Sequence, residues 1–167
     1  MSSEEPDDLL LGYLDTYVAA AIGRVVASWA ILEHEIDQLI WELAGLEKEQ
    51  GACITSQLTS VARRIDALVL LARLRKIGAP TIAKFNKFRQ RAGALAEKRN
   101  RVAHDPWHYG FDGKSHYRLQ ITAKSTLDFT YKPMTEDDIK NMVAEIESLR
   151  EQFQGLRDAA LKEYYKF

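Results

Sequence analysis

The feature that most constrains this chain is an apolar residue at every third or fourth position along four long segments. In the first segment the pattern runs from Ile22 to Leu43 and stops near Gly45. The other three segments cover residues 58–72, 80–104 and 135–164. This spacing places the apolar side chains on one face of an α-helix, and that face must be buried against other helices. We therefore predict a mainly α protein with four core helices.

The ends of the predicted helices carry start and stop signals. Gly78, with Pro80 just beyond it, is the expected stop of the second helix, and Pro80 suits the first turn of the third. The third helix must end near His104, because the residue before Pro106 avoids helical geometry. At the start of the fourth helix, the Thr135 hydroxyl can cap the first backbone amides.

Between the third and fourth helices the apolar period changes from about 3.6 to two. Residues 117–121 and 127–131 alternate apolar with polar, which predicts two β-strands joined by a turn at 124–125. The short connections between helices favour an antiparallel four-helix bundle. We thus predict a single domain over residues 1–167, with a small β-hairpin insertion at 107–132 between helices three and four.

Composition indicates a soluble helical protein, with 46% hydrophobic and 28% charged residues. The longest uncharged runs are much shorter than the roughly 20 residues of a membrane-spanning helix. Residues 1–8 carry four acids and no base, which predicts a flexible acidic tail and no signal peptide. We expect a cytoplasmic protein with no membrane partner. Cys53 is the only cysteine, so we expect no intrachain disulfide, no multi-cysteine zinc site and a small buried side chain there.

The formal net charge of −1 hides a strong segregation along the chain. Residues 1–50 hold eleven acids and two bases, whereas residues 51–101 hold twelve bases and two acids. The basic segment could form a surface that binds phosphates, since local potential depends on nearby charges more than on their total. Alternatively, it packs beside the acidic segment and is neutralised by it.

One charged residue interrupts the apolar face of the third helix. Arg99 lies four residues after Leu95 and three before Val102, where an apolar side chain is expected. An unpaired buried guanidinium is costly, so Arg99 needs either an acidic partner or an opening to a ligand. A structural salt bridge with Glu33 or Asp37 of the first helix is one explanation, and a binding cleft is the other.

The neighbours of Arg99 favour chemistry at this helix end. Asn100 and His104 are four residues apart on one helix face, so the amide could orient the imidazole. The last turn of a helix favours a protonated histidine, which can then exchange a proton near neutral pH. Arg99 and His104 diverge by roughly 140° around the helix. A two-fold dimer could bring both pairs to one cleft.

The sequence Arg99-Asn100, three further residues and His104, at the end of the third helix, resembles the R-x4-6-H signature of the HEPN superfamily of helical nucleotide-binding domains. The resemblance covers residues 15–105 and 135–160. It implies a metal-independent endoribonuclease without a cofactor, active as a homodimer whose motif helices line a shared groove. Such enzymes belong to bacterial defence or toxin-antitoxin systems, so the implied partners are RNA and an antitoxin or other regulatory protein.

The resemblance also implies residue roles. His104 would be the general acid or base when a ribose 2′-hydroxyl attacks the adjacent phosphate, and Arg99 would stabilise charge on the phosphoryl oxygens. Asn100 would orient the histidine or contact the phosphate, and Glu33 matches the acidic residue that often accompanies the pair. Toxins of this superfamily that pair with a nucleotidyltransferase antitoxin carry a modified tyrosine two residues after the histidine, where this chain has Pro106.

Residues beside the motif are further candidates for substrate binding. Lys98 and Arg101 could contact phosphates, and Trp107 and Tyr109 could stack on bases. A solvated face and packing of the hairpin onto the helices are the structural explanations for the same residues. We find no metal-ligand pattern. Two alternatives stay open: a non-catalytic HEPN scaffold that binds RNA, a nucleotide or a protein partner, and a purely structural dimeric bundle.

Overall fold

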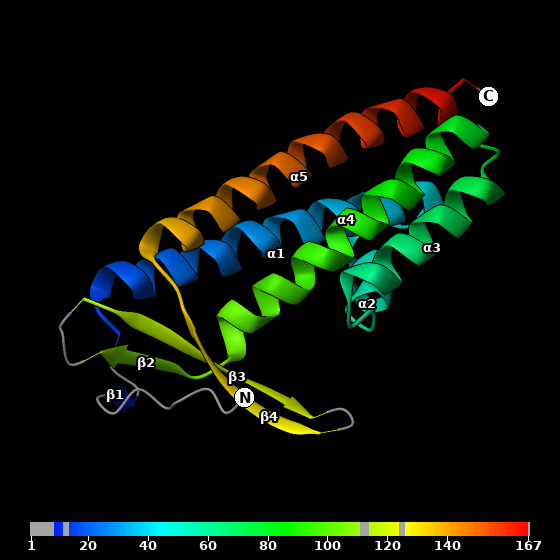
Figure 1. The fold of residues 1–167 in the computed structure, drawn as a ribbon. Coiled ribbons are helices and arrows are strands. Elements are labelled where there is room, and N and C mark those ends of the chain that lie inside the picture. The colour runs from blue at the N-terminus through cyan, green and yellow to red at the C-terminus, as the bar shows by residue number, and fades with distance from the viewer. Residues whose placement is uncertain (1–8, 12–13, 111–113, 124–125, 167) are drawn as a thin grey trace. The chain divides into compact units, whose positions relative to one another are not determined.

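The computed structural model describes residues 9–11, 14–110, 114–123 and 126–166. Within these residues it contains five helices and a four-stranded antiparallel sheet, which confirms the mainly α fold (Figure 1). The predicted acidic tail at 1–8 and the turn at 124–125 lie outside the described residues. The chain divides into two compact units: unit 1 comprises Met1–Ala27 and Glu97–Ala144, and unit 2 comprises Ser28–Ala96 and Glu145–Phe167. The prediction of a single domain stays a prediction.

The five helices are α1 (Thr16–Ala44), α2 (Lys48–Thr55), α3 (Val61–Leu74), α4 (Ala79–His104) and α5 (Glu136–Tyr164). Three of them, α1, α4 and α5, contribute residues to both units. Gly45 follows α1 with a φ of 72°, a left-handed conformation that glycine adopts without steric cost. At the start of α5, the Thr135 hydroxyl accepts from the amide of Asp138 at 3.1 Å, as the sequence predicts.

The apolar faces of the helices form the core of unit 2. Its largest fully buried side chains come from α1, α3, α4 and α5, and they are Leu32, Ile36, Leu39, Leu43, Ile65, Leu68, Phe85, Phe88, Ile146, Leu149 and Phe153. The rings of Phe88 and Phe153 lie 5.4 Å apart between their centroids. The three-and-four spacing therefore identified these largest buried side chains, but it missed Ile40, Trp41 and Val69, which are also buried.

Side-chain contacts establish the direction of α3 relative to α1. The Nε of Arg64 lies 2.9 Å from a carboxylate oxygen of Asp37, and the Nε of Arg75 donates to the carbonyl oxygen of Leu43 at 2.6 Å. Residue numbers thus rise together along the two helices, which run parallel. The antiparallel order predicted from short connections is wrong here, because α2 and its flanking loops turn the chain twice between α1 and α3.

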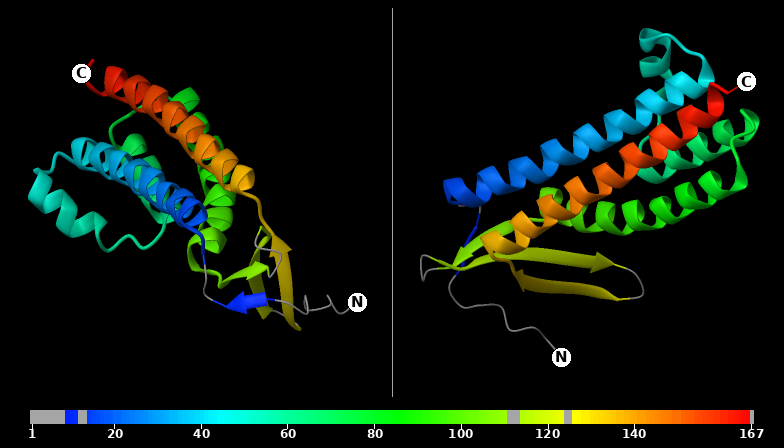
Figure 2. Two further views of the ribbon diagram at one scale, coloured as in Figure 1. Left: turned by 90° about the vertical axis from the view of Figure 1, so that its left-hand side faces the viewer. Right: turned by 90° about the horizontal axis from the view of Figure 1, so that it is seen from above.

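The other two long helices of unit 2 run in opposite directions. Arg150 contacts Glu35 at 2.8 Å and Tyr165 donates to Glu42 at 2.8 Å, so α5 is parallel to α1. Glu163, near the end of α5, accepts from the first residues of α4, so α4 is antiparallel to α5. Both views in Figure 2 show the same directions for the parts of these helices that belong to unit 2.

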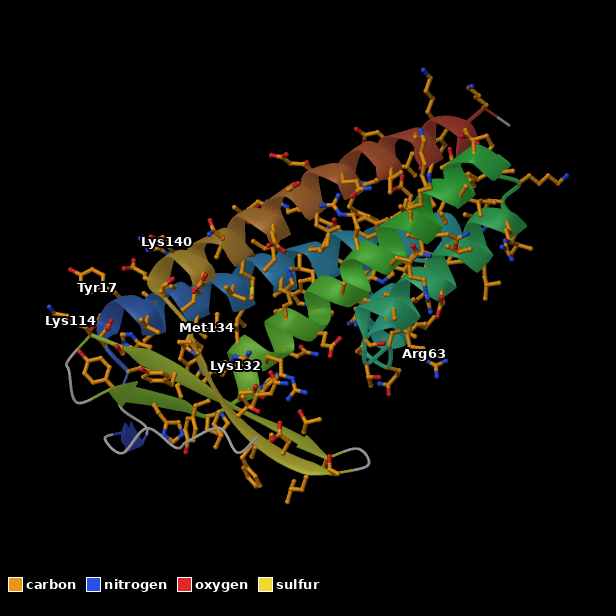
Figure 3. The ribbon with its side chains drawn as sticks, viewed as in Figure 1. Tyr17, Arg63, Lys114, Lys132, Met134 and Lys140 are labelled. Carbon is orange, nitrogen blue, oxygen red and sulfur yellow. The ribbon has the colours of Figure 1, made fainter. Side chains whose placement is uncertain are left out.

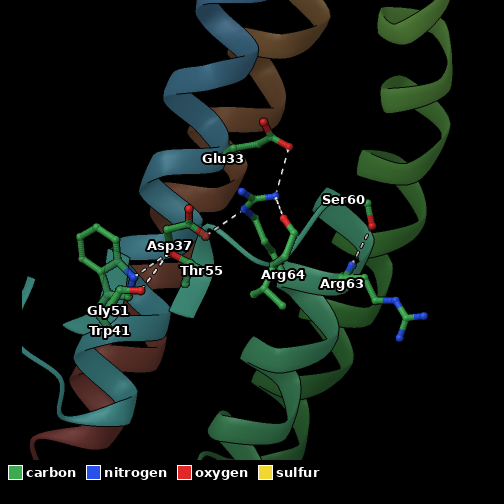
Figure 4. A network of polar contacts seen from close by, with 9 residues as sticks. Glu33, Asp37, Trp41, Gly51, Thr55, Ser60, Arg63 and Arg64 are labelled. Atoms are coloured by element: carbon green, nitrogen blue, oxygen red, sulfur yellow. Dashed lines mark hydrogen bonds and ion pairs between the residues drawn. The ribbon is translucent and has the colours of Figure 1, made fainter. Parts of the chain in front are cut away.

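Helix α2 packs against the indole ring of Trp41 (Figure 4). The indole N–H donates to the hydroxyl of Thr55 at 3.1 Å, and that hydroxyl donates to the carbonyl of Gly51 at 3.1 Å. A Cβ at Gly51 would lie 2.3 Å from the ring, so glycine is required. The sequence did not predict α2, because eight residues carry no apolar stripe of their own. Cys53, expected to be buried, is exposed on this helix.

The predicted stop at Gly78 also needs correction. Helix α3 ends at Leu74, and the left-handed residue that follows is Lys76, with a φ of 60°. Gly78 instead donates its amide to the Glu163 carboxylate at 2.6 Å, and the Thr81 hydroxyl donates to the same group at 2.7 Å. These bonds hold the pKa of Glu163 below its ordinary value, with the Gly78 amide as the largest cause.

Unit 1 contains the sheet, whose strands follow the order β1-β2-β3-β4. The strands are β1 (Leu9–Leu11), β2 (Trp107–Gly110), β3 (His116–Ala123) and β4 (Leu127–Pro133). The predicted hairpin is confirmed as β3 and β4, which pair Leu119 with Tyr131 and Ile121 with Phe129. Strands β1 and β2 were not predicted, since three or four residues are too few to show a period of two.

Helix α1 bears on the prediction that no segment of this chain spans a membrane. By length and composition alone it could cross a membrane, with a mean hydropathy of 1.2 over 18 residues. The uncharged runs of this helix are short because an occasional charge interrupts an otherwise apolar sequence. A core helix passes the same test, and α1 contributes Val25, Trp29 and Leu32 to the buried residues.

Substitution of Gly51 tests the packing of α2. We expect Gly51→Ala to lower the free energy of unfolding by about 1–3 kcal/mol, because the added methyl overlaps the indole of Trp41. Gly155→Ala is the matched control, since nothing lies within 4 Å of its added Cβ, and helix propensity predicts no loss or a gain of up to about 1 kcal/mol. Urea unfolding of both variants measures the difference, and equal stabilities would contradict this packing.

Candidate functional site

The last turns of α4, in unit 1, carry the residue that interrupted the apolar pattern. Arg99 is half-buried, and its Nη1 donates to the side-chain oxygen of Asn100 at 3.1 Å. Its Nε is buried without a hydrogen-bond partner among the described residues. Within the described part of unit 1, no carboxylate forms an ion pair with this guanidinium. A buried donor left unsatisfied is costly, so an acceptor from outside the unit would be bound favourably here.

The other two motif residues are exposed at the same helix end. His104 is the final residue of α4, and both it and Asn100 are open to solvent. No hydrogen bond joins these two side chains in the part of the chain that the structure describes, which corrects the expectation that the amide orients the imidazole. The Asn100 oxygen accepts from the adjacent guanidinium instead, and a charged donor makes the stronger bond.

Asp105, the residue after the motif, connects α4 to the sheet. One carboxylate oxygen forms an ion pair with Arg118 of β3, and the other lies 3.5 Å from Nη1 of Arg101. Arg101 also donates to the carbonyl oxygen of Ile121 at 3.3 Å. Arg101 therefore holds the helix end against β3, in addition to its predicted role in phosphate binding. Sequence reasoning missed Arg118, although the alternation along β3 places it on the polar face.

The aromatic residues after the motif are largely enclosed. Trp107 is only 8% exposed, and its indole N–H donates to the carbonyl oxygen of Val102 at 3.0 Å. Its ring packs the start of β2 and has no open face for stacking on a base, so that expectation is corrected. Tyr109 is half-buried, with its ring centroid 4.9 Å from that of His116. Lys98 is exposed on α4.

Glu33 belongs to unit 2, where both acids suggested as partners of Arg99 contact Arg64 (Figure 4). Nη1 of Arg64 lies 3.7 Å from Glu33, and its Nε lies 2.9 Å from Asp37. Burial raises the pKa of Asp37, while the Arg64 charge opposes that shift. A catalytic role for Glu33 stays a prediction, and its carboxylate has a structural partner in its own unit.

The basic segment is partly neutralised within unit 2. Arg64 and Arg89 form ion pairs with carboxylates of that unit, and Arg75 donates to a main-chain carbonyl. Arg63 is exposed and points away from the Arg64 network (Figure 4). The alternative in which basic residues are paired structurally therefore holds for several members of the segment.

A second candidate site lies in unit 1, where the first residues of α1 and α5 come together. A cavity of about 350 Å³ is lined there by residues that include Asp15, Tyr17, Lys114, His116, Met134 and Glu136. Figure 3 labels Tyr17, Lys114 and Met134 around this place. The Nε2 of His116 lies 2.9 Å from a carboxylate oxygen of Asp15, and the imidazole is 8% exposed. Sequence spacing could not reveal this pair, since its members are about a hundred residues apart.

Asp15 also caps α1. Its carboxylate accepts from the amides of Tyr17 at 2.8 Å and Val18 at 2.9 Å. The Val18 amide is the largest cause that holds the pKa of Asp15 below its ordinary value, and the charge of His116 acts in the same direction. The Asp15–His116 pair therefore has a structural role, since it joins the start of α1 to β3.

Neither place offers a metal centre in the described residues, where no group of three or more histidine, cysteine, aspartate or glutamate side chains converges. Comparisons of the chain with protein-family models, with curated proteins and with solved structures found no match.

Substitutions at Asp15 test its capping role through pH. The folded-state pKa is lowered, so the charge stabilises the fold above the ordinary value of 3.8, and this contribution is lost as the pH falls through the lowered pKa. We expect Asp15→Ala to cost about 0.5–2 kcal/mol near neutral pH, and Asp15→Asn to cost less because asparagine also caps. Urea unfolding from neutral to acidic pH should show the variants converging with wild type at low pH. A loss of stability that is the same at every pH would contradict the capping role of the Asp15 carboxylate.

Proposed function

We propose that this chain is a metal-independent endoribonuclease of the HEPN type, cytoplasmic and homodimeric, from a bacterial defence or toxin-antitoxin system. In this proposal α1, α3, α4 and α5 are the four helices of the HEPN bundle, and the strands between α4 and α5 are its insertion. An antitoxin or other regulatory protein is the second partner, besides RNA.

The observation that carries the proposal is the state of Arg99. A half-buried guanidinium on an apolar helix face would serve a structural role if a carboxylate neutralised it. Instead, both acids suggested for that role bind Arg64, and among the described residues of its unit Arg99 forms a hydrogen bond with the neutral amide of Asn100 and no ion pair. Its positive charge and its unsatisfied Nε suit a phosphate oxygen.

The proposed roles follow from this arrangement. Arg99 stabilises the charge that develops on the phosphoryl oxygens, and Asn100 positions Arg99 through their hydrogen bond. His104 moves a proton to or from the ribose 2′-hydroxyl or the leaving 5′-oxygen, which its solvent-exposed place at the helix end permits. Asp105 holds this turn against β3 through Arg101 and Arg118.

The test is cleavage of single-stranded RNA by the purified full chain in excess chelator. We expect His104→Ala to lower the cleavage rate at least about 10²-fold, because proton transfer by a positioned group contributes that much or more. His34→Ala is the matched control, an exposed histidine on α1 that should leave cleavage unchanged. Equal activity of His104→Ala and wild type would reject His104 as a catalytic residue.

A second pair of variants tests the guanidinium. Arg99→Lys keeps the charge but loses the planar fork that can bind two phosphate oxygens, so cleavage should fall while stability is retained. Arg63→Lys, at an exposed position of α3, is its control. RNA binding that weakens with salt, without cleavage by wild type, would instead indicate the non-catalytic scaffold.

A further inference from the structure

A cavity in unit 2 lies where the chain leaves α3 and α5 (Figure 1). Its volume is about 450 Å³, and it is lined by Leu74, Arg75, Lys76, Tyr164 and Tyr165. That volume is typical of sites for small molecules, which span roughly 300–1,000 Å³. The described lining combines two aromatic rings with two positive charges and includes no carboxylate. Such a lining suits a ligand that has a flat aromatic part and a negatively charged part.

The two tyrosine rings give the cavity an aromatic surface. Their centroids lie 5.0 Å apart, with an angle of 51° between the ring planes. Tyr165 is 69% exposed, and its hydroxyl donates to a carboxylate oxygen of Glu42 at 2.8 Å. This hydrogen bond holds the ring in place and raises the pKa of Tyr165, so the hydroxyl stays protonated. An exposed ring held in this way offers a face on which a planar heterocycle can stack.

Arg75 supplies the first positive charge of the lining. Its guanidinium lies 5.6 Å from the centroid of the Tyr164 ring, and its Nε donates to the carbonyl oxygen of Leu43 at 2.6 Å. Among the described residues, its two terminal nitrogens form no hydrogen bond or ion pair. Because a guanidinium carries five N–H donors, four of them remain available to phosphate oxygens, with which they form charge-assisted hydrogen bonds.

Lys76 supplies the second charge, from an uncommon backbone conformation. Its φ is 60°, in the left-handed region that glycine adopts without steric cost and lysine does not. The side chain is exposed and forms no hydrogen bond or ion pair within the described part of the chain. A residue that only had to end α3 would best be glycine. The fold therefore does not account for this lysine, and its ammonium group is available to an anion.

The negative charges near this cavity do not outweigh the two cations of the lining. The Glu42 and Glu163 carboxylates both accept hydrogen bonds within unit 2. The Gly78 amide is the largest cause of the lowered pKa of Glu163, and the charges of Lys166 and Lys84 act in the same direction. The ends of α1, α3 and α5 each add about half an elementary negative charge. The local balance is therefore positive.

We propose that this cavity binds a nucleotide, with the base stacked on Tyr165 and the phosphate bound by Lys76 and Arg75. A phosphate alone or an acidic side chain would not use the rings, and an uncharged aromatic ligand would not use the cations. The nucleotide is either free or one unit of an RNA strand, since both present the same base and phosphate. The lining residues have no part in the proposed cleavage, so the two proposals can fail independently.

The first experiment is isothermal titration calorimetry of the full chain with four probes. They are AMP, adenosine, ribose 5-phosphate and a single-stranded hexamer of deoxyadenosine, which lacks the 2′-hydroxyl that the proposed cleavage requires. We expect AMP to bind, and adenosine and ribose 5-phosphate to bind at least about tenfold more weakly, because each lacks one half of the contact. A hexamer that binds more than about tenfold tighter than AMP identifies a strand as the ligand, since further phosphates are then bound. Otherwise the ligand is a free nucleotide.

Substitutions locate the binding at this cavity. Lys76→Gly should raise the dissociation constant of AMP at least about fivefold. It should also keep or raise the midpoint of thermal unfolding, because glycine accepts the left-handed backbone. Arg63→Ala, which removes an exposed positive charge at the other end of α3, should leave the constant unchanged. Tyr165→Leu should raise the constant at least about fivefold, whereas Tyr165→Phe keeps the ring and should bind more tightly than the leucine variant.

Three results overturn the proposal: no binding of AMP or of the hexamer, adenosine or ribose 5-phosphate that binds as tightly as AMP, or a wild-type constant in Lys76→Gly and Tyr165→Leu. The unfolding midpoint of Lys76→Gly shows that weaker binding is not a loss of folded protein. Cleavage assays on the same samples separate this site from the nuclease. AMP binding that obeys these substitutions in a chain that cleaves no RNA retains the site and rejects the nuclease, whereas cleavage without such binding does the reverse.

Discussion

The arrangement of unit 1 depends on the carboxylate of Asp105. It follows a helix that must end there, because Pro106 comes next, and each of its oxygens contacts a different arginine. Arg101 comes from α4 itself and Arg118 from β3, so one side chain joins a helix end to a strand. Two charged hydrogen bonds to a half-buried acid are hard to replace, since the loss of either partner leaves an uncompensated charge. The proposed site lies beside this contact, since Arg101 and Asp105 flank His104 in the sequence.

Unit 2 shows how the other arginines differ from Arg99. Arg64 forms ion pairs with two carboxylates, those of Glu33 and Asp37. Its role is therefore structural, because these pairs stabilise the fold and join α3 to α1. Among the described residues of unit 1, Arg99 forms a hydrogen bond with a neutral amide and no ion pair. The same residue type on an apolar helix face is therefore structural in one place and a candidate ligand group in the other. The difference is whether a carboxylate of the same unit forms an ion pair with the guanidinium.

Several features of the fold could be predicted because they are encoded over short distances along the chain. The end of α4 at His104 follows from Pro106, the cap of α5 from Thr135, and strands β3 and β4 from the alternation of apolar and polar residues. Helix α2 and strands β1 and β2 were not predictable in the same way. Each is too short to show a period, and each is held by a distant residue or strand, such as Trp41 against Gly51.

The sequence by itself determined which residues form the long helices, which of their faces are buried, and that Arg99 and His104 stand together at one helix end. These properties depend on backbone periods that act within a few residues. Only the tertiary structure decided that Arg64 binds the acids predicted as partners of Arg99, that Trp107 is enclosed, and that His116 contacts Asp15. Choosing a partner for a charge or a strand depends on distances in space between residues far apart in sequence, which no local pattern contains.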